Sequence, residues 1–146
     1  MGTDATNYAK YVAGSPADFM GAEWEGKVRC IHDTYTFASA IAGTIINVGI
    51  LRKGEVFLMG YIHGDDIGSA TTLTLGDTEL DGSATILDAD RYLEATVFTT
   101  TGQKTLCMRD LGMGYKATKD MILQITVGVE TANGAIEVLI LKACPN

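Results

Sequence analysis

The sequence predicts an all-β chain: a single-domain, jelly-roll-like β-sandwich with a non-β N-terminal arm. Seven to nine short segments are rich in β-branched and aromatic residues, and glycine-containing turn pairs separate them. No amphipathic helical pattern of ten or more residues lies between these segments, which excludes a βαβ layout. We therefore assign residues 1–24 to the arm and residues 25–146 to the β-sandwich domain.

Composition limits the classes of function. The 146 residues are 47% hydrophobic and 20% charged, as expected for one folded domain. A net charge of −7 disfavours binding to nucleic-acid phosphates or to anionic membranes, so neither is an expected partner. The N-terminus has neither the basic start nor the apolar run of a secretory signal. The three cysteines are widely spaced and odd in number, which favours reduced thiols in a cytoplasm: Cys30, Cys107 and Cys144.

The arm differs in character from the rest of the chain. Asp4 is expected to cap a short helix that stops at Gly14, and Ser15-Pro16 is expected to begin a further single turn. Its large aromatic side chains need a surface to cover them, either on the same domain or on a neighbouring molecule. These aromatic residues are Tyr8, Tyr11, Phe19 and Trp24.

The first half of the β domain contains three expected strands. Residues 27–37 alternate between two faces, and residues 44–50 form a β-branched run. Arg52-Lys53-Gly54 predicts a turn. Residues 55–62 are apolar on both faces, which is typical of a strand sandwiched between layers, and Gly64-Asp65-Asp66 is expected to end it.

The second half is less regular. Residues 71–75 alternate and predict a strand, and residues 95–100 predict another. Residues 88–94 fit either one helical turn or an irregular crossing. Residues 101–119 contain three glycines and are expected to be mostly loop.

The chain is expected to close on a hairpin between residues 121 and 144. Asn133-Gly134 lies between two apolar runs, and both residues adopt positive φ at low cost, as a type I′ turn requires. This turn would place Val129 opposite Val138. It would also place Glu130 opposite Glu137, which is a repulsion that Arg29 or Lys142 would relieve.

The best metal candidate is a run of acidic residues around Asp81-Gly82. Carboxylates at positions 1, 3, 5 and 12 with glycine at position 6 resemble a calcium loop. An Asp-Gly turn with solvated carboxylates is the simpler interpretation, so we expect no metal and no cofactor. The candidate ligands would be Asp77, Glu79, Asp81 and Asp88.

Cys30 and His32 share one strand face and would supply half of a metal site or a thiol–imidazole pair. His63 is the only other histidine, and a buried thiol beside a hydrogen-bonded histidine is the simpler interpretation. The sequence carries no phosphate loop, nucleophile elbow or dinucleotide fingerprint. We therefore expect no enzymatic activity.

Four segments in this order resemble small structural proteins of tailed bacteriophages, most closely the capsid decoration (cement) proteins. The resemblance covers about residues 45–144, in β-strand and turn motifs without a catalytic signature. The segments are a turn with a long apolar strand (residues 50–62), the following strand (69–77), a crossing (88–95) and the terminal hairpin (122–141).

The resemblance implies a virion structural role on the capsid surface, after assembly in the host cytoplasm. The implied partners are the major capsid protein and further copies of the chain, as a dimer or trimer. Sheet edges and the apolar strand 55–62 suit such contacts, so the expected interface residues are those of the arm (Tyr8, Tyr11, Phe19, Trp24) and Phe57, Met59 and Tyr61.

Two alternatives remain. One is a tail or fibre adaptor that binds a host glycan through Trp24, Tyr115 and Asp110. The other is a small calcium-binding or enzymatic jelly roll built on the carboxylates around Asp81.

Overall fold

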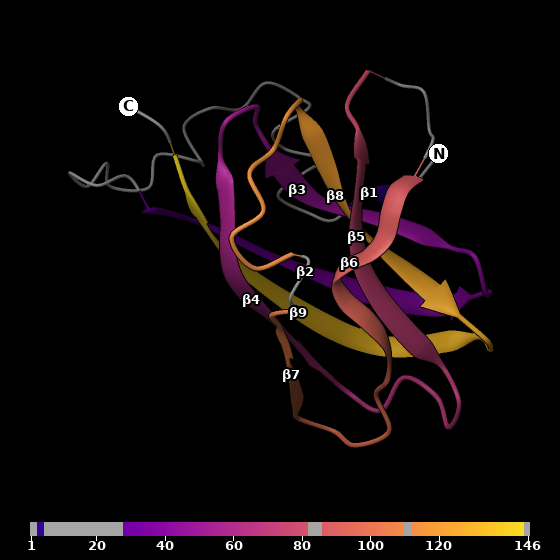
Figure 1. The fold of residues 1–146 in the computed structure, drawn as a ribbon. Helices are drawn as coiled ribbons and strands as arrows, with labels where there is room; N and C mark the ends of the chain where they lie inside the picture. The colour runs from indigo at the N-terminus through magenta and orange to yellow at the C-terminus, as the bar shows by residue number, and fades with distance from the viewer. Residues whose placement is uncertain (1–2, 5–27, 82–85, 110–111, 145–146) are drawn as a thin grey trace.

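The chain forms two packed β-sheets, as the alternating segments predict (Figure 1). The computed structural model describes residues 3–4, 28–81, 86–109 and 112–144. In this part of the chain there are nine strands: β1 (Thr3–Asp4), β2 (Val28–Ala40), β3 (Ile45–Leu51), β4 (Val56–Gly64), β5 (Thr72–Glu79), β6 (Ile86–Val97), β7 (Gln103–Cys107), β8 (Met121–Gly128) and β9 (Ala132–Ala143).

The strand order is that of a jelly roll. One sheet has the order β1-β3-β8-β5-β6, and the other has the order β2-β9-β4-β7. Apart from the two-residue β1, the antiparallel pairs β2–β9, β3–β8, β4–β7 and β5–β6 join the first of the remaining strands to the last, the second to the next-to-last, and so on inward. This is one long hairpin wound into two sheets, and it confirms the all-β, jelly-roll-like prediction.

The core fills the space between the sheets with aliphatic and aromatic side chains. Phe57 of β4 and Tyr92 of β6 are fully buried, and their rings stack across the sandwich with centroids 4.1 Å apart. Ile62, Ile125 and Ile140 are also fully buried. Burial of each such side chain contributes about 1.5–3 kcal/mol, so the inward rows of both sheets hold the layers together.

Most strand predictions are confirmed. In β2 the inward residues are Asp33, Tyr35 and Phe37, and the alternate residues face solvent. The turn at 52–54 is present, with Gly54 at φ 88° and an N–H···O bond of 2.9 Å from Glu55 to the carbonyl of Arg52. β4 alternates between buried and half-buried residues, so it is covered on one face rather than on both.

The predicted terminal hairpin is wrong. β8 pairs with β3 and β5, whereas β9 pairs with β2 and β4 in the other sheet. Gly134 does use positive φ, at 99°, but it lies inside β9 opposite Phe37. Asn133 is held there because its Oδ1 accepts a hydrogen bond of 2.9 Å from the Ser39 N–H. The Asn-Gly signal therefore marks an irregular strand start, and residues 129–131 carry the chain between the sheets.

Three further expectations need correction. Residues 88–94 belong to β6, because this segment pairs with β5 and is neither a helical turn nor a crossing. Residues 103–107 of the expected loop form β7, which pairs with β4. Thr3 and Asp4 of the supposedly non-β arm pair in parallel with Ile46 and Asn47, because the edge of β3 offers backbone groups to bind. The expected helix of the arm lies outside the described residues.

Replacing Val129 by asparagine is expected to stabilise the protein. Val129 is 70% exposed and has φ 70°, a conformation that is costly for a β-branched residue and easier for asparagine. The substitution Val129→Asn should raise the free energy of unfolding by about 1 kcal/mol, as measured by urea denaturation. Val129→Thr keeps the β-branch and should change it little; an equal gain in both variants would contradict the strain argument.

Candidate functional site

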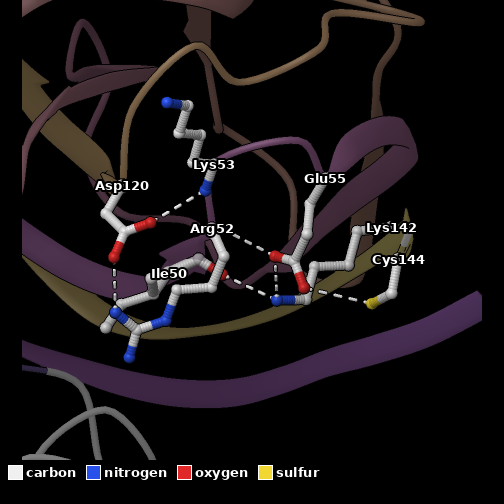
Figure 2. Close-up of polar contacts among 7 residues, drawn as sticks. All are labelled: Ile50, Arg52, Lys53, Glu55, Asp120, Lys142 and Cys144. Atoms are coloured by element: carbon white, nitrogen blue, oxygen red, sulfur yellow. Dashed lines mark hydrogen bonds and ion pairs between the residues drawn. The ribbon is translucent and has the colours of Figure 1, made fainter. Parts of the chain in front are cut away.

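A cluster of charged side chains joins the two sheets at one end of the sandwich (Figure 2). It is built on the turn from β3 to β4, which crosses from the five-stranded to the four-stranded sheet. Gly54 donates its N–H to the carbonyl of Ala117 (2.8 Å), and Ala117 donates to the carbonyl of Glu55 (2.9 Å). These bonds fix the turn against the segment that precedes β8 and direct the Glu55 carboxylate inward.

Glu55 and Lys142 form the buried centre of the cluster. The Lys142 Nζ lies 2.6 Å from Glu55 Oε2 and donates a second bond of 2.9 Å to the carbonyl of Ile50. The two side chains are only 7% and 11% exposed. Because Lys142 belongs to β9 and Ile50 to β3, this ammonium group connects the two sheets directly.

Asp120 forms the outer part of the same cluster. Its Oδ2 accepts a bond of 2.8 Å from Arg52 Nη1, and its Oδ1 accepts one of 2.8 Å from the Lys53 N–H. Both side chains of the Arg52–Asp120 pair are 41% exposed, so solvent screens this pair more than it screens Glu55 and Lys142.

The Glu55 carboxylate accepts hydrogen bonds from three donors. Burial alone would raise its pKa, but hydrogen bonds from Lys142, the Arg52 N–H and the Cys144 thiol lower the pKa below its ordinary value. Burial and the hydrogen bond to Glu55 raise the pKa of Cys144, which keeps that thiol protonated. A charged carboxylate with three donors and a protonated thiol suit structural cross-linking rather than proton transfer or nucleophilic attack.

The structure divides the four carboxylates of the calcium-loop hypothesis between two places: Asp77 and Asp88 are cross-strand partners that share Arg91, whereas Glu79 and Asp81 line a surface depression. Asp77 lies inside β5, where its Oδ2 accepts bonds from Arg91 Nε (2.9 Å) and the Tyr92 hydroxyl (2.7 Å). Glu79 pairs with Lys119 at 2.6 Å. Among the described residues there is no group of three or more His, Cys, Asp or Glu side chains placed to hold a metal ion.

Burial raises the pKa of both Asp77 and Glu55, but the net shifts of the two groups are opposite. The pKa of Asp77 lies above its ordinary value, because burial outweighs the hydrogen bond from Tyr92 and the positive charge of Arg91. The Arg91 guanidinium in turn lies over the Tyr115 ring, 4.1 Å from its centroid. One face of Tyr115 is therefore in use within the protein; Trp24 and Asp110, the other residues of the glycan hypothesis, lie outside the described residues.

Cys30 and His32 lie on β2, and the sequence did not predict the contact that His32 makes there. Glu137 of β9 lies between the two histidines of the neighbouring strands: His32 Nε2 is 2.6 Å from Oε1, and His63 Nδ1 is 3.4 Å from Oε2. The hydrogen bond from His32, together with that from His63, lowers the pKa of Glu137. Glu130 is not opposite Glu137, so the expected repulsion between them is absent.

Part of the outer face of the four-stranded sheet is apolar, over three cross-strand rows in which His32, opposite Leu139, is the exception. Cross-strand partners form rows on it, such as Cys30–Leu141–Met59 and Leu139–Tyr61–Leu106. Leu106 is 60% exposed and Val28 is 46% exposed. We call this the apolar outer face; it comprises Val28, Cys30, Met59, Tyr61, Leu106, Leu139 and Leu141.

The three interface residues predicted on β4 therefore lie in two different environments. Met59 and Tyr61 are half-buried members of the apolar outer face, whereas Phe57 lies in the core beneath them. Tyr8, Tyr11, Phe19 and Trp24 lie outside the described residues. The role of Met59, Tyr61 and the arm in an interface stays a prediction.

The outer face of the five-stranded sheet has a different chemistry. Its cross-strand rows include Asn47–Gln124 and Thr126–Thr74. Gln124 Nε2 donates a bond of 2.8 Å to Asn47 Oδ1. The two outer faces of the sandwich thus differ, because this one includes the buried, hydrogen-bonded amides of Asn47 and Gln124.

A surface depression is a further feature that bears on ligand binding. An open depression of about 330 Å³ is lined by Glu79, Leu80, Asp81, Lys119 and Asp120, and the Lys119–Glu79 ion pair lies within this set.

In the described part of the chain, no helix has the length and apolar character needed to cross a bilayer.

Sequence reasoning missed the Glu55–Lys142 pair. The available signal was a lone lysine directly after the apolar run 138–141, because a charged residue beside such a run usually has a buried partner. Nothing in the sequence identified Glu55 as that partner, since the pairing depends on which strands are neighbours.

Removing Lys142 is expected to be costly. Lys142→Met leaves the buried Glu55 charge without its ion pair and should lower the free energy of unfolding by about 3–5 kcal/mol, as measured by urea denaturation. Arg52→Met breaks only the half-exposed pair with Asp120 and should cost less than about 1 kcal/mol. Equal costs for the two variants would show that the buried pair is not the stronger connection.

The contribution of Glu55 to stability should depend on pH. Its pKa is lower in the folded chain than its ordinary value of 4.5, so the folded state binds this proton less tightly than the unfolded state. The contribution is complete above about pH 4.5 and is lost as the pH falls through the lower, folded-state pKa. The stability difference between the wild type and Glu55→Gln should therefore shrink between pH 5 and pH 3; a constant difference would exclude this linkage.

Comparison with known proteins is informative only at the level of structure. No protein-family model matches the chain, and no curated protein sequence matches it either. Solved structures do match. A chain in the capsid of Ralstonia phage GP4 superposes with a TM-score of 0.69 and 19% identity, over 86% of this chain and 90% of that one.

Two other capsid structures give similar results. A chain in the cyanophage Pam1 capsid asymmetric unit has a TM-score of 0.64 and 20% identity, over 86% of this chain and 90% of that one. A chain in the acidic stable capsid of Helicobacter pylori bacteriophage KHP30 has a TM-score of 0.61 and 15% identity, over 84% and 92%. The chain thus has a β-sandwich fold that is also present in the capsids of these three bacteriophages.

Proposed function

We propose that this protein is a structural component of a tailed-bacteriophage virion, and specifically a decoration protein that binds the outer shell and stabilises neighbouring capsomers. The observation that carries the proposal is the match over nearly the whole of both chains to a component of the Ralstonia phage GP4 capsid. Two chains that cover each other to 86% and 90% are of similar size, so the jelly roll forms most of each of them.

Mass action explains how such a protein would stabilise a shell. Decoration requires only that the protein bind the assembled state, because binding to that state alone shifts the equilibrium toward assembly. At a free concentration of 100 times the Kd, each occupied site adds about 2.7 kcal/mol.

The described side chains suit such a role and not an enzymatic one. The most buried ionisable groups are occupied with one another, as Glu55 is with Lys142 and Asp77 is with Arg91 and Tyr92. We therefore propose no enzymatic activity and no cofactor. The partners are the major capsid protein, through the arm aromatics Tyr8, Tyr11, Phe19 and Trp24, and further copies of the chain, as a dimer or trimer.

Co-sedimentation with empty shells of the phage that encodes the protein tests the proposal. The full chain should pellet with the shells in a saturable manner and should raise their melting temperature. Deleting residues 1–20 should weaken binding at least tenfold. A thermal melt of the deleted chain checks that the domain still folds.

Electron microscopy of virions provides a second readout. Density for the jelly roll on the outside of the shell is the expected result. A protein found only in the tail, or absent from the particle, would exclude a decoration role.

A further inference from the structure

The apolar outer face is partly exposed to solvent: Val28 and Leu106 are exposed, and Leu139 and Leu141 at its centre are half-buried. The outer face of the opposite sheet includes threonine, asparagine and glutamine side chains, of which Asn47 and Gln124 are buried. On the four-stranded sheet the corresponding positions carry leucine, methionine and tyrosine. Exposed contiguous apolar patches on soluble proteins usually mark interaction sites.

We propose that the apolar outer face of the four-stranded sheet binds the same face of a second copy of this chain. The inference deepens the proposed function, on which it rests for the assignment of the arm to the shell and of this face to self-association. The contact residues of this dimer are Met59, Tyr61, Leu106, Leu139 and Leu141, with Val28 and Cys30 at the edge of the patch.

Charge supports a second copy as the occupant. A two-fold contact brings together two copies of the same surface, so a surface with a large net charge of one sign repels itself and a nearly neutral surface does not. The chain carries a net charge of −7, yet the three cross-strand rows that contain Val28, Cys30 and Leu139 include no aspartate, glutamate, lysine or arginine, and His32 is their single histidine. Two acidic surfaces elsewhere on the molecule would repel each other, whereas two copies of this face would not.

The polar border of the face supports the same conclusion. Glu137, the carboxylate beside Leu139 on β9, is held by His32 and His63 rather than left facing solvent alone. His63 is opposite Lys104 of β7, which places a positive charge in the same row as Glu137. This row lies along one side of the apolar residues, in the manner of a polar rim around an interface core.

The extent of the face fits a weak interface. Four strands spaced ~4.8 Å apart, over the roughly 20 Å from the row of Val28 to the row of Glu137, give a projected area on the order of 400 Å². This is within the usual range of functional patches. Counted on both copies it is about 800 Å², which is below the ~1,200 Å² at which stable interfaces begin. We therefore expect a dimer that depends on concentration and that becomes more populated when copies are held close together on a lattice.

Analytical ultracentrifugation of the full chain, without shells, tests the proposal from micromolar to several hundred micromolar protein. The wild type should pass from a monomer of 15.5 kDa toward twice that mass. Leu139→Lys, at the centre of the face, and Leu106→Lys, at an exposed edge position, should each weaken association at least tenfold. The control Val97→Lys adds the same charge at a 43%-exposed apolar position of β6 in the other sheet, and it should dimerise like the wild type.

Cys30 supplies a local readout in the same experiment. It is the exposed cysteine of the three and lies in the face, whereas Cys107 is buried and Cys144 is half-buried. Reaction of Cys30 with a thiol reagent, located by mass spectrometry, should slow at least fivefold at dimeric concentrations of the wild type and should not slow in Leu106→Lys.

Several outcomes would overturn the inference. These are a wild type that stays monomeric throughout, a mass above that of a dimer, an Leu106→Lys variant that associates normally, or a Val97→Lys variant that does not associate. Because no shell is present, a dimer that fails to bind shells would refute the decoration role alone, and a monomer that binds shells would refute this inference alone.

Discussion

Hydrogen bonding of β9 to β2 on one side and to β4 on the other is the constraint on which the rest of the structure depends. This pairing places the strand nearest the C-terminus at the centre of the four-stranded sheet. It sets the inward row of Ile136, Val138 and Ile140 against the core and the outward row of Leu139 and Leu141 against solvent. It also puts Glu137 between histidines from strands far apart in sequence.

The charged cluster at the end of the sandwich depends on the same pairing. Lys142 reaches Glu55 and the carbonyl of Ile50 because β9 runs beside β4 and ends near the turn that joins the two sheets. In a packed sandwich the hydrophobic layer is non-directional, since any sliding of one sheet over the other keeps apolar groups in contact. A buried ion pair with several hydrogen bonds has a defined geometry, so it restricts that sliding.

Local patterns in the sequence were sufficient for the strands but not for their partners. Alternation predicted the two faces of β2, and Arg52-Lys53-Gly54 predicted the turn before β4, because both depend on residues close in sequence. Asn133-Gly134 misled because positive φ is needed at an irregular strand start as well as in a tight turn. The Glu55–Lys142 and His32–Glu137–His63 contacts were not predictable, since each requires knowledge of which distant strands are neighbours.

The first-to-last pairing also determines when the apolar outer face comes into existence. During synthesis, β2 and β4 emerge well before β9, and without β9 between them they have no common sheet. Residues such as Cys30 and Met59 therefore do not form a continuous surface until residues 132–143 have been translated and inserted. Nascent chains and chains truncated before residue 132 therefore lack the completed surface, which is a property of the sheet with β9 in place.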